Sequence, residues 1–365
     1  MSTALSIVIA IFVFGLLIFV HEGGHYVAAR LCGVTVKEFA IGMGPKLASW
    51  VSKKTNIRYS LRLLPFGGFT SMEGEEEESD DPHALGKQSV WRRIIIIAAG
   101  PLTNIVLGIV IMSLLVIFTD TLGSTTIHSF IDDTEVIDEM SDGETDTDTD
   151  ATGSLSEKTG LMVGDTITAI DGESVHTANE LSYEVMRRGI EPVDVTVIRG
   201  GETVVIENVE FPVTSSSGVA FGSLDFYVYA EEKTVLNVIK HAFWRSELTI
   251  EMVWESLYDL ITGRYGVEAV SGPVGVTETL GEAASTGISN LVYIAVVLSI
   301  NLGVMNLLPI PALDGGHLVF MIIEILRGGK KIKPDTEAMI NFAGLCILMV
   351  FMVFVTCKDI ASLFG

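Results

Sequence analysis

The chain has 365 residues, of which 48% are hydrophobic, and its formal net charge is -23. The acidic residues are concentrated: the stretch from Thr119 to Gly287 holds 32 acidic and 8 basic residues, while the remainder holds 14 and 15. The long apolar runs exclude an ordinary soluble protein, and the lack of a basic surface argues against nucleic-acid binding. The three cysteines include no CxxC pair, which argues against a thiolate zinc site or a disulfide framework.

Four stretches are long and apolar enough to span a bilayer about 30 Å thick. They run over residues 4–20, 94–118, 288–310 and 338–356. A cleaved signal peptide is the alternative for the first stretch. It is disfavoured because no Lys or Arg precedes Arg30 and no small-residue cleavage site follows the apolar run. We therefore expect four retained spans.

The distribution of Lys and Arg predicts the orientation of these spans. Ten of these residues lie between Ala28 and Arg93, and four lie between Arg327 and Lys333. Both segments are cytoplasmic under the positive-inside rule. The two termini and the acidic block then face outward, so we expect a multi-pass protein of the cell membrane.

The segments between the spans have their own patterns. Alternating apolar residues predict a strand at 57–64, and Gly67-Gly68 predicts a turn or a tight backbone approach. In the acidic block, the alternation from Gly160 to Val175, a helical stretch and two short strands predict a small mixed α/β module. The helix is expected at 178–188 and the strands at 193–198 and 203–209.

Two other parts of the outer block are distinctive. Residues 131–152 are rich in Asp, Glu, Thr and Ser, which predicts an exposed or disordered insertion. Residues 234–262 form an amphipathic pattern with Val235, Ile239 and Phe243 on its stripe. We prefer packing of this stripe against the module over a membrane-surface or partner-facing position.

The first span carries His21-Glu22-Gly23-Gly24-His25 near its inner end. Positions i and i+4 differ by about 40° around a helix, so both imidazoles lie on one face, one turn apart. Two neutral imidazoles at this spacing suit a tetrahedral zinc ion, and Glu22 beside them suits a general base for hydrolysis. Ionisable groups at this depth are costly unless they are paired or bound to something.

A catalytic zinc needs a third protein ligand, and the third span supplies a candidate. Pro309 and Pro311 should break its helix, and Gly315 and Gly316 permit tight turns. Irregular backbone at membrane depth is tolerated where it lines a cavity, so Asp314 could turn inward to the metal. His317, beyond the two glycines, is a rival third ligand.

Six motifs spread over most of the chain point to one family. They are the histidine motif at 21–25, Phe-Ala-Ile-Gly-Met-Gly-Pro at 39–45, Pro-Phe-Gly-Gly-Phe at 65–69, Ala-Gly-Pro-Leu-Thr-Asn at 99–104, Ser-Gly-Pro-Val-Gly at 271–275 and Asn-Leu-Leu-Pro-Ile-Pro-Ala-Leu-Asp-Gly-Gly at 306–316. The chain resembles the site-2 proteases, the M50 family of zinc intramembrane metalloproteases, and specifically its bacterial RseP/RasP-like branch with one PDZ domain. Residues 160–175 resemble a PDZ core.

The resemblance implies a site of six residues. These are the zinc ligands His21, His25 and Asp314, the catalytic base Glu22, and the substrate-binding residues Asn301 and Asn306. Amide side chains can satisfy the backbone groups of an unwound substrate helix, although hydrogen bonding between helices is the alternative for both asparagines. The strand at 57–64 would give an extended substrate an edge to pair with.

The implied fold is a polytopic α-helical membrane protein with four transmembrane helices, an inserted extracytoplasmic mixed α/β PDZ-like domain and a cytoplasmic membrane-associated β-hairpin. Its expected regions are a first transmembrane helix (1–30), a cytoplasmic loop with the hairpin (31–93), a second transmembrane helix (94–118), the PDZ-like domain (119–233), an amphipathic helix with the Ser-Gly-Pro-Val-Gly loop (234–287), a third transmembrane helix ending in Leu-Asp-Gly-Gly (288–317), a cytoplasmic loop (318–337) and a fourth transmembrane helix (338–365).

The implied function is zinc-dependent cleavage of transmembrane segments in single-span membrane proteins, such as anti-sigma factors or remnant signal peptides. The PDZ-like domain would admit shortened substrates or take a peptide ligand, although the acidic stretch Asp138–Asp150 would repel a free carboxylate. A zinc transporter would need ionisable residues on several spans, but the second and fourth spans have none. A catalytically silent scaffold would have no need for Glu22.

Overall fold

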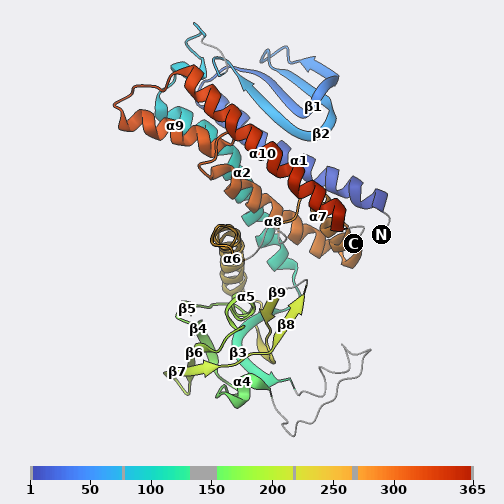
Figure 1. Ribbon diagram of the computed structural model, residues 1–365, viewed down its shortest axis with the longest axis vertical. Helices are drawn as coiled ribbons and strands as arrows, with labels where there is room; N and C mark the ends of the chain where they lie inside the picture. Colours follow the sequence, from blue (N-terminus) through green and yellow to red (C-terminus); the bar gives the residue numbers. More distant parts are fainter. Residues whose placement is uncertain (1–2, 76–78, 132–153, 217–218, 265–269, 363–365) are drawn as a thin grey trace. The chain divides into compact units, whose positions relative to one another are not determined.

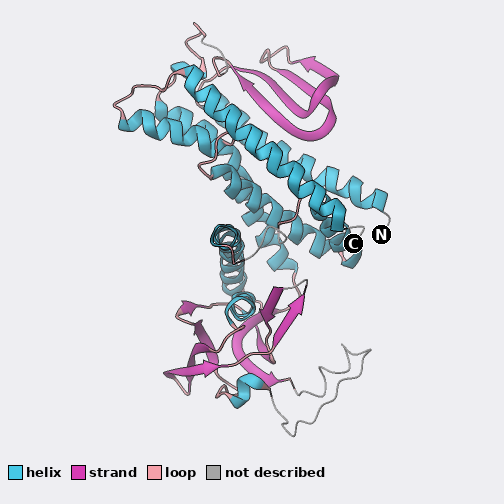
Figure 2. Ribbon diagram, in the orientation of Figure 1, coloured by secondary structure: helices cyan, strands magenta, loops and turns pink. Residues whose placement is uncertain are grey.

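The computed structural model describes residues 3–75, 79–131, 154–216, 219–264 and 270–362 (Figure 1). These residues form two compact units, one made of residues 1–112 and 249–365 and the other of residues 113–248. Helices dominate the first unit and a β-sheet dominates the second (Figure 2). The stretch 132–153, which holds almost all of the expected acidic insertion, lies outside the described residues.

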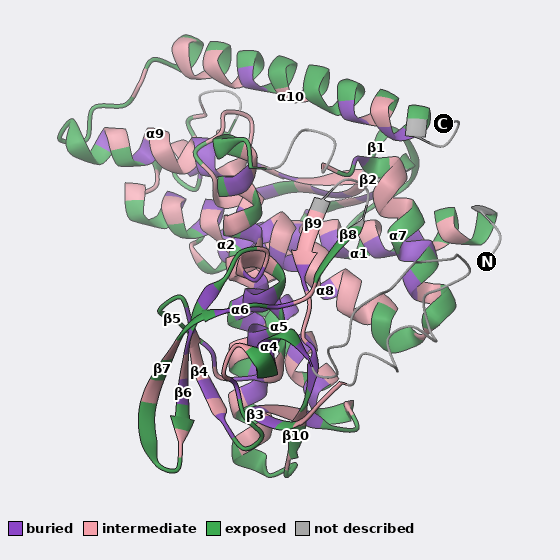
Figure 3. Ribbon diagram, turned by 60° about the horizontal axis from the view of Figure 1, so that its bottom comes forward, coloured by how far each residue is buried: buried purple, intermediate pink, exposed green. Residues whose placement is uncertain are grey.

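Among the described residues, four helices are long and apolar enough to cross a membrane. They are α1 (Thr3–Leu31), α2 (Val90–Phe118), α8 (Ile288–Leu307) and α10 (Pro334–Ser362). Large apolar side chains cover their outer faces, and α10 is mostly exposed or half-buried along its length (Figure 3). Such surfaces suit hydrocarbon, in which a helix satisfies every backbone polar group internally.

Helix α1 packs through residues spaced like one face of a helix. Ala10, Val13 and Leu17 are buried against Leu280 of the shorter helix α7 (Pro273–Thr286). The Ser-Gly-Pro-Val-Gly segment, expected as a loop, begins this helix with Pro273 in its first turn. Proline suits that position because the first turn of a helix needs no intrahelical N–H bond.

Small residues let α2 and α8 approach closely. A Cβ on Gly303 would lie 2.7 Å from the carbonyl oxygen of Pro101, and one on Gly108 would lie 2.5 Å from Ile300. The Ser299 hydroxyl donates a hydrogen bond of 2.9 Å to the carbonyl oxygen of Asn104 at the same crossing. Close backbone approach through small residues is a common way to hold helices together in a membrane.

The third span ends earlier than the sequence predicts. Helix α8 stops at Leu307, and a separate helix α9 (Asp314–Leu326) begins after the proline-containing loop. The region 288–317, expected as the third span, therefore holds α8, the proline-containing loop and the start of α9, and the expected loop over 318–337 holds most of α9 and the start of α10. The prolines break the helix as expected, but the chain becomes helical again at once, because an acidic residue in the first turn, Asp314, and the apolar run after His317 suit a new helix.

Strands β1 (Val36–Val51) and β2 (Arg58–Met72) form an antiparallel hairpin and are both bent. The first part of β1 pairs with both ends of β2, since Phe39 lies opposite Thr70 and also opposite Tyr59. The segment 58–61 is thus paired on both sides, with 38–41 and with 48–51. The expectation that 57–64 offers a free edge was wrong for 58–61, because the bend of β1 places 48–51 along their other side. Among the described strands, the segment 68–72 is paired on one side only.

The second unit contains an antiparallel sheet in the order β10-β3-β4-β6-β7, with the short β5 paired to β4. Its strands are β3 (Leu122–Phe130), β4 (Thr166–Ile170), β5 (Glu173–Ser174), β6 (Val193–Arg199), β7 (Glu202–Val209) and β10 (Phe226–Glu231). A two-stranded sheet of β8 (Val213–Ser216) and β9 (Val219–Gly222) and the helices α4 (Leu155–Lys158) and α5 (Ala178–Arg188) complete it. The predicted helix and both predicted strands lie where the pattern placed them, to within a residue.

The core of this unit lies between the sheet and α5. Ile127, Ile167 and Val195 of the sheet are buried with Leu181 and Val185 of the helix. Thr177 caps the start of α5 by accepting a hydrogen bond from the Glu180 backbone N–H, as threonine often does at a helix N-cap. Helix α6 (Val235–Thr262) follows the last strand. Its stripe was expected to pack against the module, which was wrong for Val235, Ile239 and Phe243, because all three are more than half exposed.

Candidate metal centre

Helix α1 brings two imidazoles together within the membrane unit. His21 and His25 are separated by one turn, and their Nε2 atoms lie 3.3 Å apart. The two residues are only 9% and 6% exposed. The helical spacing in the sequence is therefore realised as a buried pair on one face of α1.

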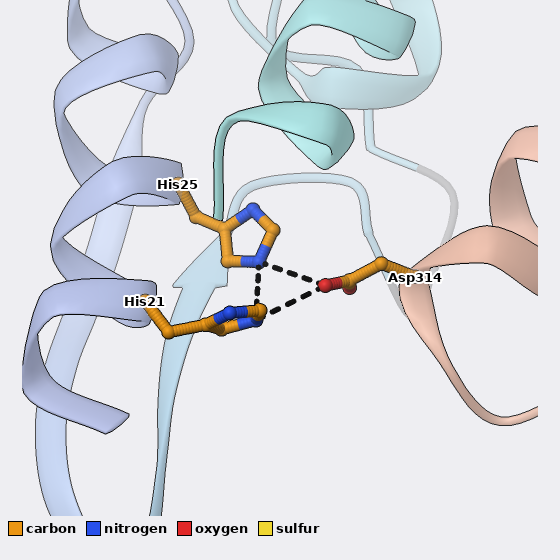
Figure 4. Close-up of side chains that lie close together, drawn as sticks. All are labelled: His21, His25 and Asp314. Atoms are coloured by element: carbon orange, nitrogen blue, oxygen red, sulfur yellow. Dashed lines mark hydrogen bonds and ion pairs between the residues drawn. The ribbon is translucent and has the colours of Figure 1, made fainter. Parts of the chain in front are cut away.

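Asp314 completes the cluster from the start of α9 (Figure 4). Its Oδ2 atom lies 3.0 Å from His21 Nε2 and 3.4 Å from His25 Nε2. Among the described residues, these three form the group of histidine, cysteine and acidic side chains that could hold a metal ion. Residues almost 300 positions apart in the chain thus converge on one point.

The hydrogen bonding of His25 fixes which ring nitrogen faces the cluster. Its Nδ1 lies 2.9 Å from the carbonyl oxygen of Ile96 on α2. A carbonyl can only accept, so Nδ1 carries the proton and Nε2 keeps a free lone pair. A carbonyl on the far ring nitrogen is the usual way in which a metal-binding histidine is held in its tautomer.

The spacing of the three donor atoms fits a zinc ion. Ligands bonded at about 2.0–2.1 Å to a tetrahedral zinc stand about 3.3 Å from one another. The measured separations of 3.0, 3.3 and 3.4 Å match three corners of such a tetrahedron. Two imidazoles and one carboxylate are also a donor set that catalytic zinc sites use, with the fourth corner open.

Glu22 lies next to the histidine pair and beside strand β2. Its backbone carbonyl accepts a hydrogen bond of 3.0 Å from the Thr70 hydroxyl. A Cβ on Gly68 would lie 3.2 Å from Glu22 Cγ and 2.9 Å from the carbonyl oxygen of Ala40. The sequence predicts a turn or a tight backbone approach at Gly67-Gly68, and Gly68 provides the tight approach. It lets β2 pack against the turn of α1 that carries Glu22.

Glycines make room for the cluster on its other sides. A Cβ on Gly100 of α2 would lie 2.3 Å from His25 Nε2, and one on Gly24 would lie 2.5 Å from the carbonyl oxygen of Ala99. Gly315 and Gly316 allow the proline-containing loop to fold back over the start of α9, because side chains there would strike the carbonyl oxygens of Leu308 and Ile310. Gly24, Gly100, Gly315 and Gly316 are therefore steric requirements, whereas a Cβ on Gly23 would meet nothing within 4 Å.

The other sequence-predicted residues lie outside the three-residue cluster. The His317 side chain is 40% exposed, and its Nδ1 lies 3.3 Å from the Glu337 carboxylate. Asn301 and Asn306 are half-buried on α8. The Asn306 amide donates a 3.0 Å hydrogen bond to the Leu302 carbonyl of its own helix.

Residues 9–351 match peptidase family M50, a range that includes every member of the cluster. The chain belongs to peptidase family M50. It is 30% identical over 440 aligned residues to the Regulator of sigma-W protease RasP of Bacillus subtilis, covering 98% of this chain and 99% of that one. It is 29% identical to the Zinc metalloprotease RasP of Oceanobacillus iheyensis with the same coverage. A relative in Clostridium acetobutylicum is 34% identical over 355 residues, which cover 97% of both chains.

This M50 peptidase is therefore a zinc metalloprotease of the site-2 protease type. The family match makes it a membrane protein, and four helices of the described residues are long and apolar enough to cross the bilayer. Sequence reasoning had not assigned a task to Ile96, Gly100 or Thr70. Gly100 lies in the motif at 99–104, which is part of the family resemblance. Nothing in the sequence indicates that Gly100 lies against His25.

Proposed function

We propose that this peptidase hydrolyses peptide bonds inside the transmembrane segments of single-span membrane proteins. The observation that supports this most strongly is the position of the metal cluster on an apolar span. His21 and His25 belong to a helix segment, Ala4–Leu31, with a mean hydropathy of 2.8. A substrate peptide bond must therefore lie within the membrane to reach a metal centre on this helix.

Four side chains have proposed roles. His21, His25 and Asp314 would hold the zinc ion, which would polarise the scissile carbonyl and lower the pKa of a water molecule. Glu22 takes the proton from the attacking water and passes it to the leaving amine. Its place beside His21, with β2 against its side chain, supports this role.

A substrate helix must unwind before its peptide bonds can be attacked, because its backbone groups are bonded to one another. Asn301 and Asn306 lie on α8 just before the helix breaks, and their amides would bind freed backbone groups of the substrate. The segment 68–72 is the favoured place for an extended substrate to add as a further strand. It has one unpaired side among the described strands, and Gly68 within it lies against Glu22.

The first experiment separates chemistry from metal binding. The Glu22→Gln protein should keep its zinc and its fold while losing hydrolysis, since the lost function is proton transfer. Zinc content and cleavage of a single-span test substrate are measured on the same purified sample. Substantial cleavage by Glu22→Gln would remove Glu22 from the role of base.

A second experiment tests the ligand set with a matched control. The intact protein should hold about one zinc ion per chain, as expected of one three-ligand site. Asp314→Ala should lower that content, whereas His317→Ala, three residues along the same helix, should not. Unchanged zinc in Asp314→Ala would exclude Asp314 and make His317 the next candidate.

We propose that both termini and residues 119–233 are extracytoplasmic, and that the segments 31–93 and 318–337 are cytoplasmic. The Lys and Arg counts support this orientation. A reporter fused after Gly200 should behave as extracytoplasmic and one fused after Gly328 as cytoplasmic. The exposed apolar side chains of Leu47, Trp50 and Leu63 support a membrane-associated hairpin.

Residues 119–233 are proposed to be a PDZ-like domain, supported by the antiparallel sheet and the helix α5 packed on it. The name of the Bacillus subtilis relative, Regulator of sigma-W protease, supports substrates that control a sigma factor, so anti-sigma proteins are the first proposed class and remnant signal peptides the second. Comparing membrane proteomes of cells with intact and Glu22→Gln protein tests this, because true substrates accumulate as uncut stubs. A proteome with no accumulating stub would count against both classes.

A further inference from the structure

Asn104 ends the motif at 99–104, and its side chain has no part in the site described so far. The residue is 0% exposed on α2, and neither its Oδ1 nor its Nδ2 atom has a hydrogen-bond partner among the described residues. Its backbone carbonyl, by contrast, accepts the hydrogen bond from Ser299. A buried amide with both polar atoms unpaired is costly, and native structures nearly always give such a group a partner. The Asn104 amide is therefore suited to hold another group at this position.

His21 carries a second unpaired atom. Its Nε2 faces Asp314, but its Nδ1 is buried and has no partner among the described residues. The matching Nδ1 of His25 is bonded to the carbonyl oxygen of Ile96. A histidine that binds a metal usually donates the N–H of its other ring nitrogen to a carbonyl, a carboxylate or a water molecule. His21 therefore needs a hydrogen-bond acceptor of the kind that His25 already has.

Helices α1 and α2 run antiparallel where they pack together. Ile96 of α2 lies in one buried cluster with Ala28, near the end of α1. Leu107, three turns farther along α2, packs on another cluster with Leu17, three turns closer to the start of α1. Each further turn of α2 is therefore level with an earlier turn of α1.

The face of α2 that carries Asn104 also faces the metal ligands. A Cβ on Gly100 would lie 2.3 Å from His25 Nε2. Asn104 is one turn beyond Gly100, about 6 Å farther along the axis and only about 40° around it. Because the helices are antiparallel, this turn is level with His21, one turn before His25. Side chains of a helix tilt toward its N-terminus, so the Asn104 amide leans back toward the metal centre.

The other buried side-chain atoms without a partner are in different places. Among the described residues of the membrane unit they belong to Thr55 and Arg62, in or beside the hairpin, to Arg93, near the start of α2, and to Asp314, a member of the cluster itself. Asn104 is therefore the unpaired group outside the cluster that lies level with His21.

We propose that Asn104 positions His21 as a zinc ligand, by accepting the hydrogen bond of its Nδ1–H through one bridging water molecule. The two side chains do not bond directly in the structure, and a buried water is held by polar partners of this kind. The bond keeps the proton on Nδ1, which leaves the lone pair of Nε2 free for the metal. This role rests on the zinc-ligand role proposed above for His21.

The first measurement is the zinc affinity of the full-length purified protein, by competition with a chelator. Asn104→Leu keeps a similar volume and removes the acceptor, so it should weaken zinc binding about 10–100-fold. Asn104→Asp keeps an acceptor oxygen and should retain most of the affinity. The matched control is Ser299→Ala, which removes a hydrogen bond from the same helix crossing but leaves the Asn104 amide in place. Its affinity should equal that of the intact protein.

A comparison of double variants shows whether Asn104 acts through His21. The His21→Ala protein should bind zinc more weakly than the intact protein, and adding Asn104→Leu should cause no further loss. In the His25→Ala protein, adding Asn104→Leu should still weaken binding about 10–100-fold, because His21 remains to be positioned.

Three results would overturn the role of Asn104. They are an unchanged affinity in Asn104→Leu, an equal loss in Ser299→Ala, and a further loss in the His21→Ala background as large as that in the His25→Ala background. If Asn104→Leu does not fold, Asn104→Ala, which only removes atoms, takes its place in each comparison. Unchanged zinc binding in His21→Ala itself would exclude His21 from the ligand set, and the role of Asn104 would fall with it.

Discussion

The ring of His25 fills the space beside Gly100, and this contact gives the first residue-level prediction. A methyl group at Gly100 would lie 2.3 Å from Nε2 and 2.6 Å from Cε1 of the ring. Gly100→Ala should therefore displace the imidazole and weaken zinc binding about 10–100-fold, as changes around metal ligands commonly do. Competition with a chelator measures the affinity.

The control for this substitution lies on the neighbouring helix. Gly15 is also a glycine in a span, and a Cβ there would meet nothing within 4 Å. Gly15→Ala should leave zinc affinity and cleavage unchanged. Equal affinities for the two variants would show that Gly100 has no steric role at the centre.

The sequence revealed site residues where the relevant spacing is local. His21, Glu22 and His25 could be found because the chemistry of two imidazoles one turn apart is visible within five residues. Asp314 could be found because prolines and glycines around it predict irregular backbone. The Ile96 carbonyl that orients His25 is 71 positions away from it, and no spacing rule connects them. Contacts between helices decide such partners, and a single sequence does not specify the contacts.

At the scale of elements, Glu38 makes the hairpin sensitive to acid. Its carboxylate accepts hydrogen bonds from Ser60 at 2.6 Å, Arg62 at 2.9 Å and Lys46 at 3.0 Å. Burial raises the pKa of Glu38, but the hydrogen bonds from Ser60, Arg62 and Lys46 outweigh it and bring the pKa to about 2. The ionised carboxylate therefore stabilises the folded hairpin.

The sign of the pH dependence follows from the lowered pKa. The stabilisation is fully present above the ordinary pKa of 4.5 and is lost as the pH falls from there toward 2. Hydrogen exchange in β1 and β2, corrected for the intrinsic effect of pH, should accelerate across this window. Glu38→Gln should show faster exchange at neutral pH and little further change in acid. An acid response that persists in Glu38→Gln would assign it to another group.

A buried ion pair joins α9 to α2. The Arg93 guanidinium donates to both carboxylate oxygens of Glu324, at 2.6 and 2.7 Å, and both side chains are 11% exposed. Asp314 is at the other end of the same short helix. Removing one partner leaves a buried charge unpaired, which typically costs about 3–5 kcal/mol.

Arg93→Met and Glu324→Met should each lower the thermal midpoint of the purified protein strongly. The double variant should recover much of the loss, because an apolar pair of similar volume can replace a buried ion pair. Midpoints that fall additively in the double variant would mean that the two residues do not act as a pair.

Element types were easier to predict than the ways in which elements bend. The four spans, α5 and the strands β6 and β7 follow from local periodicity. The hairpin did not, because the pairing of Phe39 with both Thr70 and Tyr59 depends on bends that alternation does not encode. Helix α9 was missed because the prolines signal the end of a helix and carry no information about how soon the next one begins.

At the scale of the whole molecule, most of the second unit can be removed by a single excision. Leu122 and Glu231 are paired at the ends of β3 and β10, so a short Gly-Ser turn can replace residues 123–230. Leu122 stays because it packs against Val116 and Ala242. A narrower deletion within the module would leave β3 and β10 without their neighbours. Zinc content should be unchanged, because no member of the metal cluster lies in the excised part.

Cleavage by the excised protein then decides what the module does. If it excludes substrates with bulky outer domains, an untrimmed substrate should be cut faster after excision. If it concentrates substrates by binding their tails, an already trimmed substrate should be cut more slowly. We expect the first result, and slower cleavage of the trimmed substrate alone would contradict it.

Because β3 and β10 are paired, the two ends of the module lie next to each other, and this affects how the module can evolve. A segment whose ends are neighbours can be lengthened, shortened or exchanged by recombination without altering the distance between the residues that flank it. Mutations there need no compensating change among the helices that carry the metal ligands. Recognition can thus diverge between lineages, or be grafted from one chain to another, while the hydrolytic chemistry is inherited intact.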